Sequence, residues 1–222
     1  MTQKNNLSMM DVWNQQEIPP GPQHIQRRRI GAAMNSIMDK LIRLDADLDQ
    51  ITELADQFEG LEKQISEYGR MDQMEIFKRF LNKEGSEEDA LNITDYDILT
   101  GLSSPLNLPM KTWIDGDKVR GEVRAGLQYQ GPPGRIHGGM VAAIFDVLLA
   151  QTQAIAKVMG FTGTLKIKYL KATPLNTDLT LEAEVIRLEG RKLFNRGIIM
   201  ANGEVTAEAE GIWIQADMGK PS

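Results

Sequence analysis

The segment from Gly131 to Gly160 constrains the fold of this chain most strongly. Between Ile136 and Ala156 it contains one charged side chain, that of Asp146, in an otherwise apolar or neutral run. Apolar residues recur there at spacings of three and four, which predicts a helix that is covered on most sides. Polar residues at positions 151–153 interrupt the run and make it a poor membrane span. A buried helix is therefore the preferred interpretation.

A carboxylate inside a buried helix needs a physical explanation. An unpaired charge in such a place costs several kcal/mol. The Asp146 carboxylate should therefore form hydrogen bonds, have an altered pKa, or lie beside a polar cavity. The residues alone leave a structural buried acid and a catalytic carboxylate equally open.

The residues around Asp146 resemble those of a known family. The string GPPGRIHGG is followed by MVAAIFD, with the aspartate nine positions after His137, and this resembles hotdog-fold acyl-CoA thioesterases of the PaaI type. The later strings TGTLKIKYLKATPL and LEGRKLF resemble the strands that follow the central helix in that family, so the resemblance covers roughly Ser104 to Gln215. It implies an α+β hotdog fold, in which an antiparallel sheet wraps one long helix, and the hydrolysis of acyl-CoA thioesters to free acid and coenzyme A.

Composition sets wider limits. With 222 residues, the chain is long enough for one ordinary domain and an additional region. A net charge of -6 argues against bulk nucleic-acid binding, and the absence of cysteine excludes disulfides and thiolate nucleophiles. The amino-terminal residues lack the layout of a secretory signal, so we expect a cytoplasmic protein without a membrane span.

Three regions follow from the order of patterns along the chain. Residues 1–29 are predicted to be a flexible lead-in that ends after the string IPPGP, and residues 30–100 a helical region. Apolar residues from Ile30 to Ile65 follow a heptad repeat, which predicts a coiled coil or a long helical hairpin. A second, shorter helix is predicted around residues 71–81, with an inner face formed by Met71, Met74, Phe77 and Leu81. Residues 101–222 are then predicted to form the hotdog domain, with five or six strands.

The start and the middle of the buried helix carry the chemistry that we expect. A helix that begins near Gly138 presents free amide groups at its positive end, and the amide of Gly138 or Gly139 can stabilise an oxyanion. Asp146 would act as a general base toward water or as a nucleophile that forms a transient anhydride. Thr162 lies where some members of the resembled family carry a hydroxyl near this aspartate, and Thr164 is a second candidate. A strand-start hydroxyl that caps local backbone is an equally good reading of either threonine.

The spacing of these groups predicts at least a dimer. Gly138 and Asp146 are eight residues apart, which on one helix is roughly 12 Å along the axis. They therefore cannot contact the same carbonyl, and each site would combine the helix start of one subunit with the aspartate of another. The resemblance implies the same arrangement, as a homodimer or a dimer of dimers.

Further residues are candidates for binding the substrate. His137 lines the site in the resemblance, although holding the loop by a hydrogen bond is the slightly preferred role. Positive charges near the pocket mouth would bind the phosphates of coenzyme A, and any one of them could equally be a solvated surface charge. The candidates are Lys166, Lys168, Lys171, Arg191 and Lys192.

Two other functions stay open at this point. The chain could be a non-catalytic acyl-CoA-binding hotdog module that signals through its helical amino-terminal region. A hotdog dehydratase is less favoured because the expected pairing of aspartate and histidine is not seen. No cofactor is expected, since coenzyme A is part of the substrate, and two histidines make a multi-histidine metal site improbable.

Overall fold

A computed structural model describes residues 18–216 of the chain. Four helices come first: α2 (Pro22–Leu41), α3 (Leu48–Ser66), α4 (Gln73–Leu81) and α5 (Glu87–Thr94). The second part contains the strands β1 (Met110–Asp115), β2 (Lys118–Val123), β3 (Gly160–Tyr169), β4 (Leu179–Glu189), β5 (Lys192–Ala201) and β6 (Glu204–Gln215). Between β2 and β3 lie the short 3-10 helix η1 (Leu127–Tyr129) and the helices α6 (Gly138–Ala150) and α7 (Thr152–Ala156).

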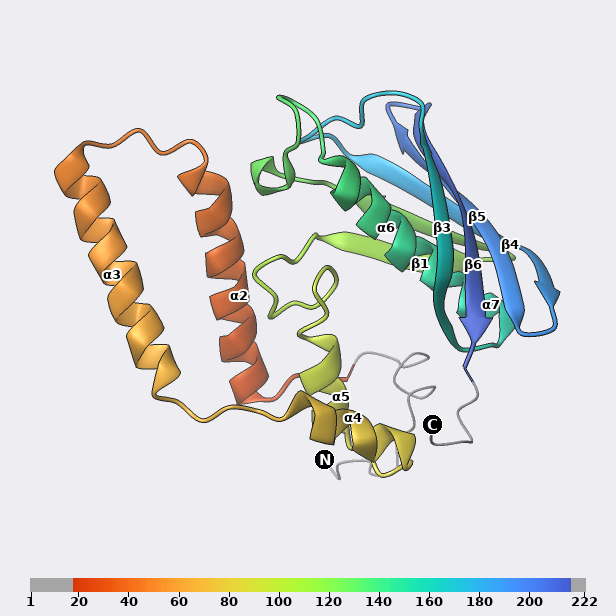
Figure 1. Cartoon of the computed structure of the whole chain (residues 1–222), viewed down its shortest axis with the longest axis horizontal. Coiled ribbons are helices and arrows are strands. Elements are labelled where there is room, and N and C mark those ends of the chain that lie inside the picture. The colour runs from red at the N-terminus through yellow and green to blue at the C-terminus, as the bar shows by residue number, and fades with distance from the viewer. Residues whose placement is uncertain (1–17, 217–222) are drawn as a thin grey trace.

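The strands form one antiparallel sheet in the order β1-β2-β4-β5-β6-β3, and α6 lies across one face of it (Figure 1). Burial alternates along β4 and β5, because every second side chain points toward α6. The helix contributes its apolar side to the same core through Val141, Ile144, Phe145, Leu148 and Leu149. The expected hotdog architecture, with six strands around one helix, is confirmed.

The central helix is nearly the predicted length. The stretch Gly138–Ala156 is apolar and long enough to cross a membrane by composition alone, but its α6 part packs in the main core. At Gln151 the backbone keeps right-handed helical angles, and the chain continues into α7. The buried side chain of Asn195 on β5 donates hydrogen bonds to the Leu149 carbonyl (3.0 Å) and the Thr152 hydroxyl (2.9 Å). This strand residue therefore fixes the junction between the two helices.

The amino-terminal helices begin earlier than predicted, and they form the helical hairpin that was one of the two predicted arrangements (Figure 1). The first described helix begins at Pro22, not at Ile30, because proline suits the first helical turn. Residues 42–47 divide the predicted heptad repeat, and Asp47 caps a new helix by accepting a hydrogen bond from the Gln50 amide (2.9 Å). The two helices form the hairpin beside the sheet in Figure 1 rather than one continuous coiled coil. No residue of α3 is buried within the part of the chain that the structure describes.

The α2 helix is attached to the rest of the molecule by polar contacts. The Arg28 guanidinium donates bidentate hydrogen bonds to the carboxylate of Asp95, a buried residue that directly follows α5. Farther along α2, Asn35 donates to the Pro105 and Asn107 carbonyls and to the Tyr129 hydroxyl. These contacts hold α2 against α5 and against the segment that leads into the sheet.

The short helix α4 presents a different face from the one predicted. Ile76 and Phe80 are buried and form a small second core with Ala90 of α5, whereas Met74 is 62% exposed. The inner face of α4 is therefore rotated away from Met74, because its position is set by packing on α5 rather than by its own apolar residues.

Candidate active site

The Asp146 side chain lies on the side of α6 that faces away from the sheet. Its neighbours Phe145 and Leu148 are fully buried against the strands, whereas Asp146 is only half-buried. A cavity of about 840 Å³ lies beside it, between α6 and the residues around the end of α5. The carboxylate is therefore not a core group. It lies at a cavity of the size that binds small ligands.

The hydroxyl of Thr162 is the hydrogen-bond partner of Asp146. Thr162 Oγ1 donates to Asp146 Oδ1 at 2.7 Å. Thr162 pairs with Trp213 of β6, whose side chain is buried in the core, and both residues point toward α6. The strand therefore brings a hydroxyl to the carboxylate from sixteen positions along the chain.

A bulge in β3 separates the two threonine candidates. Thr162 pairs with Trp213 and Thr164 pairs with the next residue, Ile212, so Gly163 is the extra residue between them. In a regular strand the two threonines would share a face. The bulge instead leaves Thr162 toward Asp146 and Thr164 on the outer face. A Cβ atom at position 163 would lie 2.8 Å from Ile214 Cγ1, which explains the glycine there.

The two glycine amides at the start of α6 differ in their partners. His137 caps the helix, and its Nδ1 accepts a hydrogen bond from the Gly139 amide at 3.0 Å. Since Nδ1 is the acceptor, the ring proton of neutral His137 is on Nε2. The Gly138 amide has no hydrogen-bond acceptor within residues 18–216. Of the two predicted oxyanion donors, Gly138 is thus the one that is available, and His137 has the loop-holding role.

Tyr169 also belongs to this helix start. It was not among the predicted site residues, although its alternation with Lys166 and Lys168 already indicates the inner face of β3. Its hydroxyl donates to the Gly138 carbonyl at 2.9 Å, from the far end of β3. The two ends of β3 therefore contact the two groups of interest on α6. Thr162 binds the carboxylate, and Tyr169 covers the helix start.

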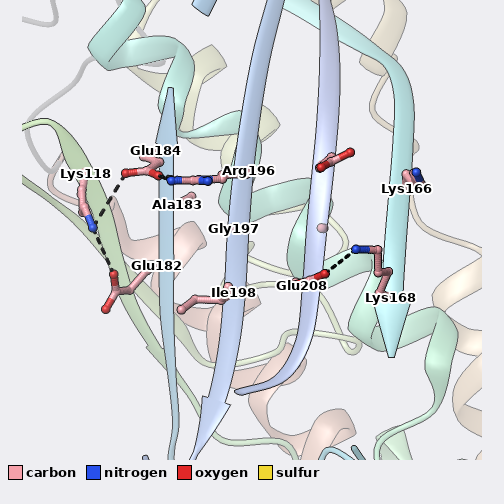
Figure 2. Close-up of a pocket in the computed structure, with 12 residues that line it drawn as sticks. Lys118, Lys166, Lys168, Glu182, Ala183, Glu184, Arg196, Gly197, Ile198 and Glu208 are labelled. Atoms are coloured by element: carbon pink, nitrogen blue, oxygen red, sulfur yellow. Dashed lines mark hydrogen bonds and ion pairs between the residues drawn. The ribbon is translucent and has the colours of Figure 1, made fainter. Parts of the chain in front are cut away.

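Two of the predicted lysines, Lys166 and Lys168, lie on the opposite face of the sheet from α6 (Figure 2). Leu165 and Ile167 of β3 pack against the core. Because successive side chains of a strand point to opposite faces, Lys166 and Lys168 point outward. Lys168 Nζ contacts Glu208 Oε1 at 2.7 Å, and this hydrogen bond raises the pKa of the lysine. Acidic and basic side chains alternate across the outer face, from Lys118 on β2 to Lys168 on β3. The structure does not bring Lys166 or Lys168 together with Asp146 of the same chain.

Arg191 occupies a third position, in the turn between β4 and β5. Its guanidinium donates two hydrogen bonds to the Gln215 carbonyl, at 3.1 and 2.8 Å. This contact closes the end of the sheet where β6 finishes. Arg191 therefore stabilises this end of the sheet. Its role in binding a substrate phosphate stays a prediction.

The match to a family model covers residues 133–208 and thus includes the His-Gly-Gly step, Asp146 and Thr162. These residues form a thioesterase superfamily domain. The domain is similar to acyl-coenzyme A thioesterase THEM4 of Mus musculus, with 38% identity over 100 residues, which are 44% of this chain and 43% of the relative. It is also similar to THEM5 of Homo sapiens, with 28% identity over 99 residues, 44% of this chain and 40% of the relative. The chain spans less than half the length of these curated relatives.

One solved structure matches beyond the thioesterase superfamily domain. The crystal structure of a thioesterase superfamily protein, 27% identical, matches 85% of this chain and 90% of its own with a TM-score of 0.70. A match of that extent includes helices before the sheet. The match therefore extends to part of the amino-terminal helical region in that thioesterase superfamily protein. Assignment to the PaaI type stays a prediction.

Proposed function

We propose that this chain hydrolyses acyl-CoA thioesters to free acid and coenzyme A. The observation that carries the proposal is the Asp146 carboxylate, held by the Thr162 hydroxyl at 2.7 Å and exposed to a ligand-sized cavity. The match of residues 133–208 to the thioesterase superfamily supports it, and so does the similarity to proteins named acyl-coenzyme A thioesterases.

The site offers the groups that thioester hydrolysis requires. In the general-base route, Asp146 takes a proton from water as the water oxygen attacks the thioester carbonyl. Negative charge develops on the carbonyl oxygen, where the free Gly138 amide stabilises it. Collapse of this intermediate breaks the carbon–sulfur bond, and the coenzyme A thiolate takes up the proton. In the nucleophilic route, Asp146 attacks the carbonyl itself, the carbon–sulfur bond breaks, and coenzyme A leaves as a thiolate that takes up a proton from solvent. Water then hydrolyses the resulting anhydride, which releases the free acid and restores the Asp146 carboxylate.

The hydrogen bond from Thr162 affects both routes in the same way. It engages Oδ1 of Asp146 and leaves Oδ2 free for water or for the carbonyl carbon. A carboxylate held on one oxygen has a fixed orientation, so fewer of its conformations are unproductive. The proposed reaction needs water and no cofactor.

The same geometry supports a composite site in a homodimer. Gly138 and Asp146 both lie on α6, about 12 Å apart along its axis, so one carbonyl cannot reach both on the same helix. β3, which carries Thr162, is an edge strand and pairs only with β6 within the described residues. Its other edge is available to pair with β3 of a second copy. We therefore propose that the Gly138 amide and Asp146 of each site come from different subunits.

A direct test compares the wild type with the Asp146→Asn variant. Both are incubated with a series of acyl-CoA thioesters, and released coenzyme A is measured with a thiol reagent. Loss of the general base is expected to lower kcat by about 10²- to 10⁴-fold, while asparagine keeps the shape of the side chain and can still accept a hydrogen bond from Thr162. Equal rates for the two proteins would overturn the role of Asp146.

The same assay separates the enzyme from the alternative, a non-catalytic acyl-CoA-binding module. The exposed apolar residues of α2 and α3 give that alternative some support, since such faces commonly bind another protein. Tight binding of acyl-CoA by the wild type without release of free coenzyme A would favour the binding module over the enzyme.

A further inference from the structure

The cavity beside Asp146 has two walls that come from different parts of the chain. One wall is the outer side of α6. The other is formed by the first residue of α4 and by residues at and after the end of α5. The lining residues are Asp146, Val147 and Ala150 on α6 and Gln151 directly after it, and Gln73, Ile93, Thr94, Tyr96, Asp97 and Thr100 on the opposite side.

The α6 wall extends from the carboxylate along the helix. Asp146 and Ala150 are four residues apart, so they lie on the same side of α6, about 6 Å apart along the axis. Val147 and Gln151 flank them in the same way. Consider an acyl chain whose carbonyl carbon lies at Asp146. If the chain extends along this wall, it contacts Val147 and the small side chain of Ala150.

The opposite wall is fixed to the main core and does not depend on a loose loop. Leu99 and Leu108, which lie on either side of the connecting segment, are buried in the same core cluster as α6. The Leu108 amide donates to the Leu99 carbonyl at 2.7 Å. Asp97 Oδ1 accepts hydrogen bonds from the Leu99 and Thr100 amides, at 3.1 and 2.8 Å. The lining residues between positions 93 and 100 are therefore held at a defined distance from Asp146.

Ile93 and Tyr96 are the large side chains on this second wall. Ile93 is half-buried and also packs against the small core of α4 and α5, whereas Tyr96 is 43% exposed beside the cavity. Together with Val147 and Ala150 they provide apolar surface that faces the carboxylate-bearing helix. The remaining lining residues contribute hydroxyl, amide and carboxylate groups to the cavity wall.

We propose that the acyl group of the substrate binds in this cavity, and that Ile93 and Tyr96, from the helical amino-terminal region, determine which acyl chains are accepted. The inference rests on the proposed thioesterase function and assigns the amino-terminal region a task in it. Acyl chains long enough to pass Ala150 contact the second wall, and the acetyl group does not. A change at Ile93 or Tyr96 therefore alters the rate for long chains and leaves the rate for acetyl-CoA nearly constant.

The test measures kcat/KM of the full chain for acetyl-, hexanoyl-, dodecanoyl- and palmitoyl-CoA. Ile93→Trp adds volume to the cavity wall and is expected to lower the ratio of dodecanoyl-CoA to acetyl-CoA kcat/KM by about tenfold or more. Tyr96→Ala removes volume and is expected to shift the preferred chain to a longer one. Thermal unfolding of each variant verifies that it is folded.

Matched controls use the same substitutions away from the cavity. Ile98→Trp lies on the same segment, at a side chain that is 61% exposed and does not line the cavity. Tyr68→Ala removes a tyrosine that follows α3 and is 60% exposed, compared with 43% for Tyr96. Both controls are expected to keep the chain-length profile of the wild type.

The outcomes distinguish this inference from the function on which it rests. If the wild type hydrolyses acyl-CoA and folded Ile93→Trp and Tyr96→Ala proteins keep its chain-length profile, the acyl group lies elsewhere. The inference is then overturned and the thioesterase proposal stands. If the wild type hydrolyses none of the four thioesters, the thioesterase proposal fails and the inference fails with it.

Discussion

At the scale of single residues, the orientation of Asp146 depends on one hydroxyl group. Thr162 Oγ1 contacts Asp146 Oδ1 at 2.7 Å, from a position on β3 where the threonine is exposed. A hydrogen bond to a charged group contributes about 1.5–3 kcal/mol. Without it, the carboxylate of Asp146 would be free to rotate and to bind solvent instead of the reacting water.

Removing this hydroxyl should lower activity while the protein stays folded. Thr162→Val keeps the shape of the side chain and is expected to lower kcat by about tenfold to hundredfold, in line with the loss of a hydrogen bond to a charged group. Thr162→Ser keeps the hydroxyl and should recover most of the rate. Thr164→Val, on the outer face of the same strand, is the matched control. A rate for Thr162→Val equal to that of the control would contradict the assignment.

The role of His137 can be separated from catalysis in a similar way. His137→Ala removes the acceptor for the Gly139 amide and should lower the free energy of unfolding by about 1 kcal/mol, as measured by urea titration. His137→Asn restores an efficient helix cap and should recover both stability and kcat. If the imidazole touches the substrate, the asparagine variant will instead be stable and slow.

At the scale of secondary-structure elements, α4 and α5 are joined by a partly buried ion pair. Arg79 of α4 donates two hydrogen bonds to the Asp89 carboxylate of α5, whose side chain is 10% exposed. This contact, with a smaller effect of Ser86, holds the pKa of the Asp89 carboxyl below its ordinary value of 3.8. Since α5 carries part of the cavity wall, the ion pair also supports the proposed acyl site.

The ion pair predicts how stability changes in acid. The folded protein binds the Asp89 proton less tightly than the unfolded chain does. Its contribution to the free energy of unfolding is thus complete above the ordinary pKa of 3.8 and is lost as the pH falls through the lower pKa of the folded state. Asp89→Asn should be less stable at neutral pH and should lose less stability than the wild type between about pH 5 and pH 3.

Urea titration at several pH values measures this difference. Glu204→Gln is the matched control, because its carboxylate pairs with Lys171 at the exposed surface and has its pKa lowered in the same direction. Exposed ion pairs contribute little to stability, so this control should follow the wild type. Stability curves of wild type and Asp89→Asn that stay parallel through the acid range would contradict the prediction.

The elements also show what the sequence could predict. The hotdog sheet was predictable because its strands alternate and its turns carry residues that accept positive φ, as at Asn202 and Gly203. The outward direction of Lys166 and Lys168 was also readable, from their alternation with Leu165 and Ile167. The sequence interpretation placed those lysines by charge and did not use the alternation.

Other features had no local signal. The bulge at Gly163 depends on how β3 pairs with β6, a strand more than forty residues away, so the choice between Thr162 and Thr164 could not be made from β3 alone. The break in the heptad repeat did leave a trace, because Asp47 and Gln50 form a capping box. The apolar residues nevertheless keep heptad spacing through positions 42–47, so the repeat alone does not show that the helix is broken there. The inner face of α4 was misjudged because contacts with α5 set it.

At the scale of the whole molecule, the proposed composite site can be tested by mixing subunits. Gly138 is the first residue of α6, where proline is tolerated and removes only the amide hydrogen. Gly138→Pro and Asp146→Asn should each be inactive alone. In a mixed dimer one site combines both defects, while the other combines the intact amide of one subunit with the intact carboxylate of the other.

The recovered rate has an expected size. Random mixing makes about half of the dimers mixed, and each has one intact site of two, so about a quarter of the wild-type activity should return. Co-expression with two affinity tags isolates the mixed species, and light scattering measures its mass against the 24.8 kDa of one chain. A mixed species without activity would show that both groups act within one subunit.

The position of Gly138 and Asp146 on one rigid helix has a consequence for substrate saturation. In the proposed dimer each α6 supplies its amide to one site and its carboxylate to the other. A substrate that moves α6 at one site therefore changes the distance between reacting groups at the second site, because a packed helix moves as a unit. Binding at the two sites is then coupled, and the two acyl-CoA molecules bind with unequal affinities.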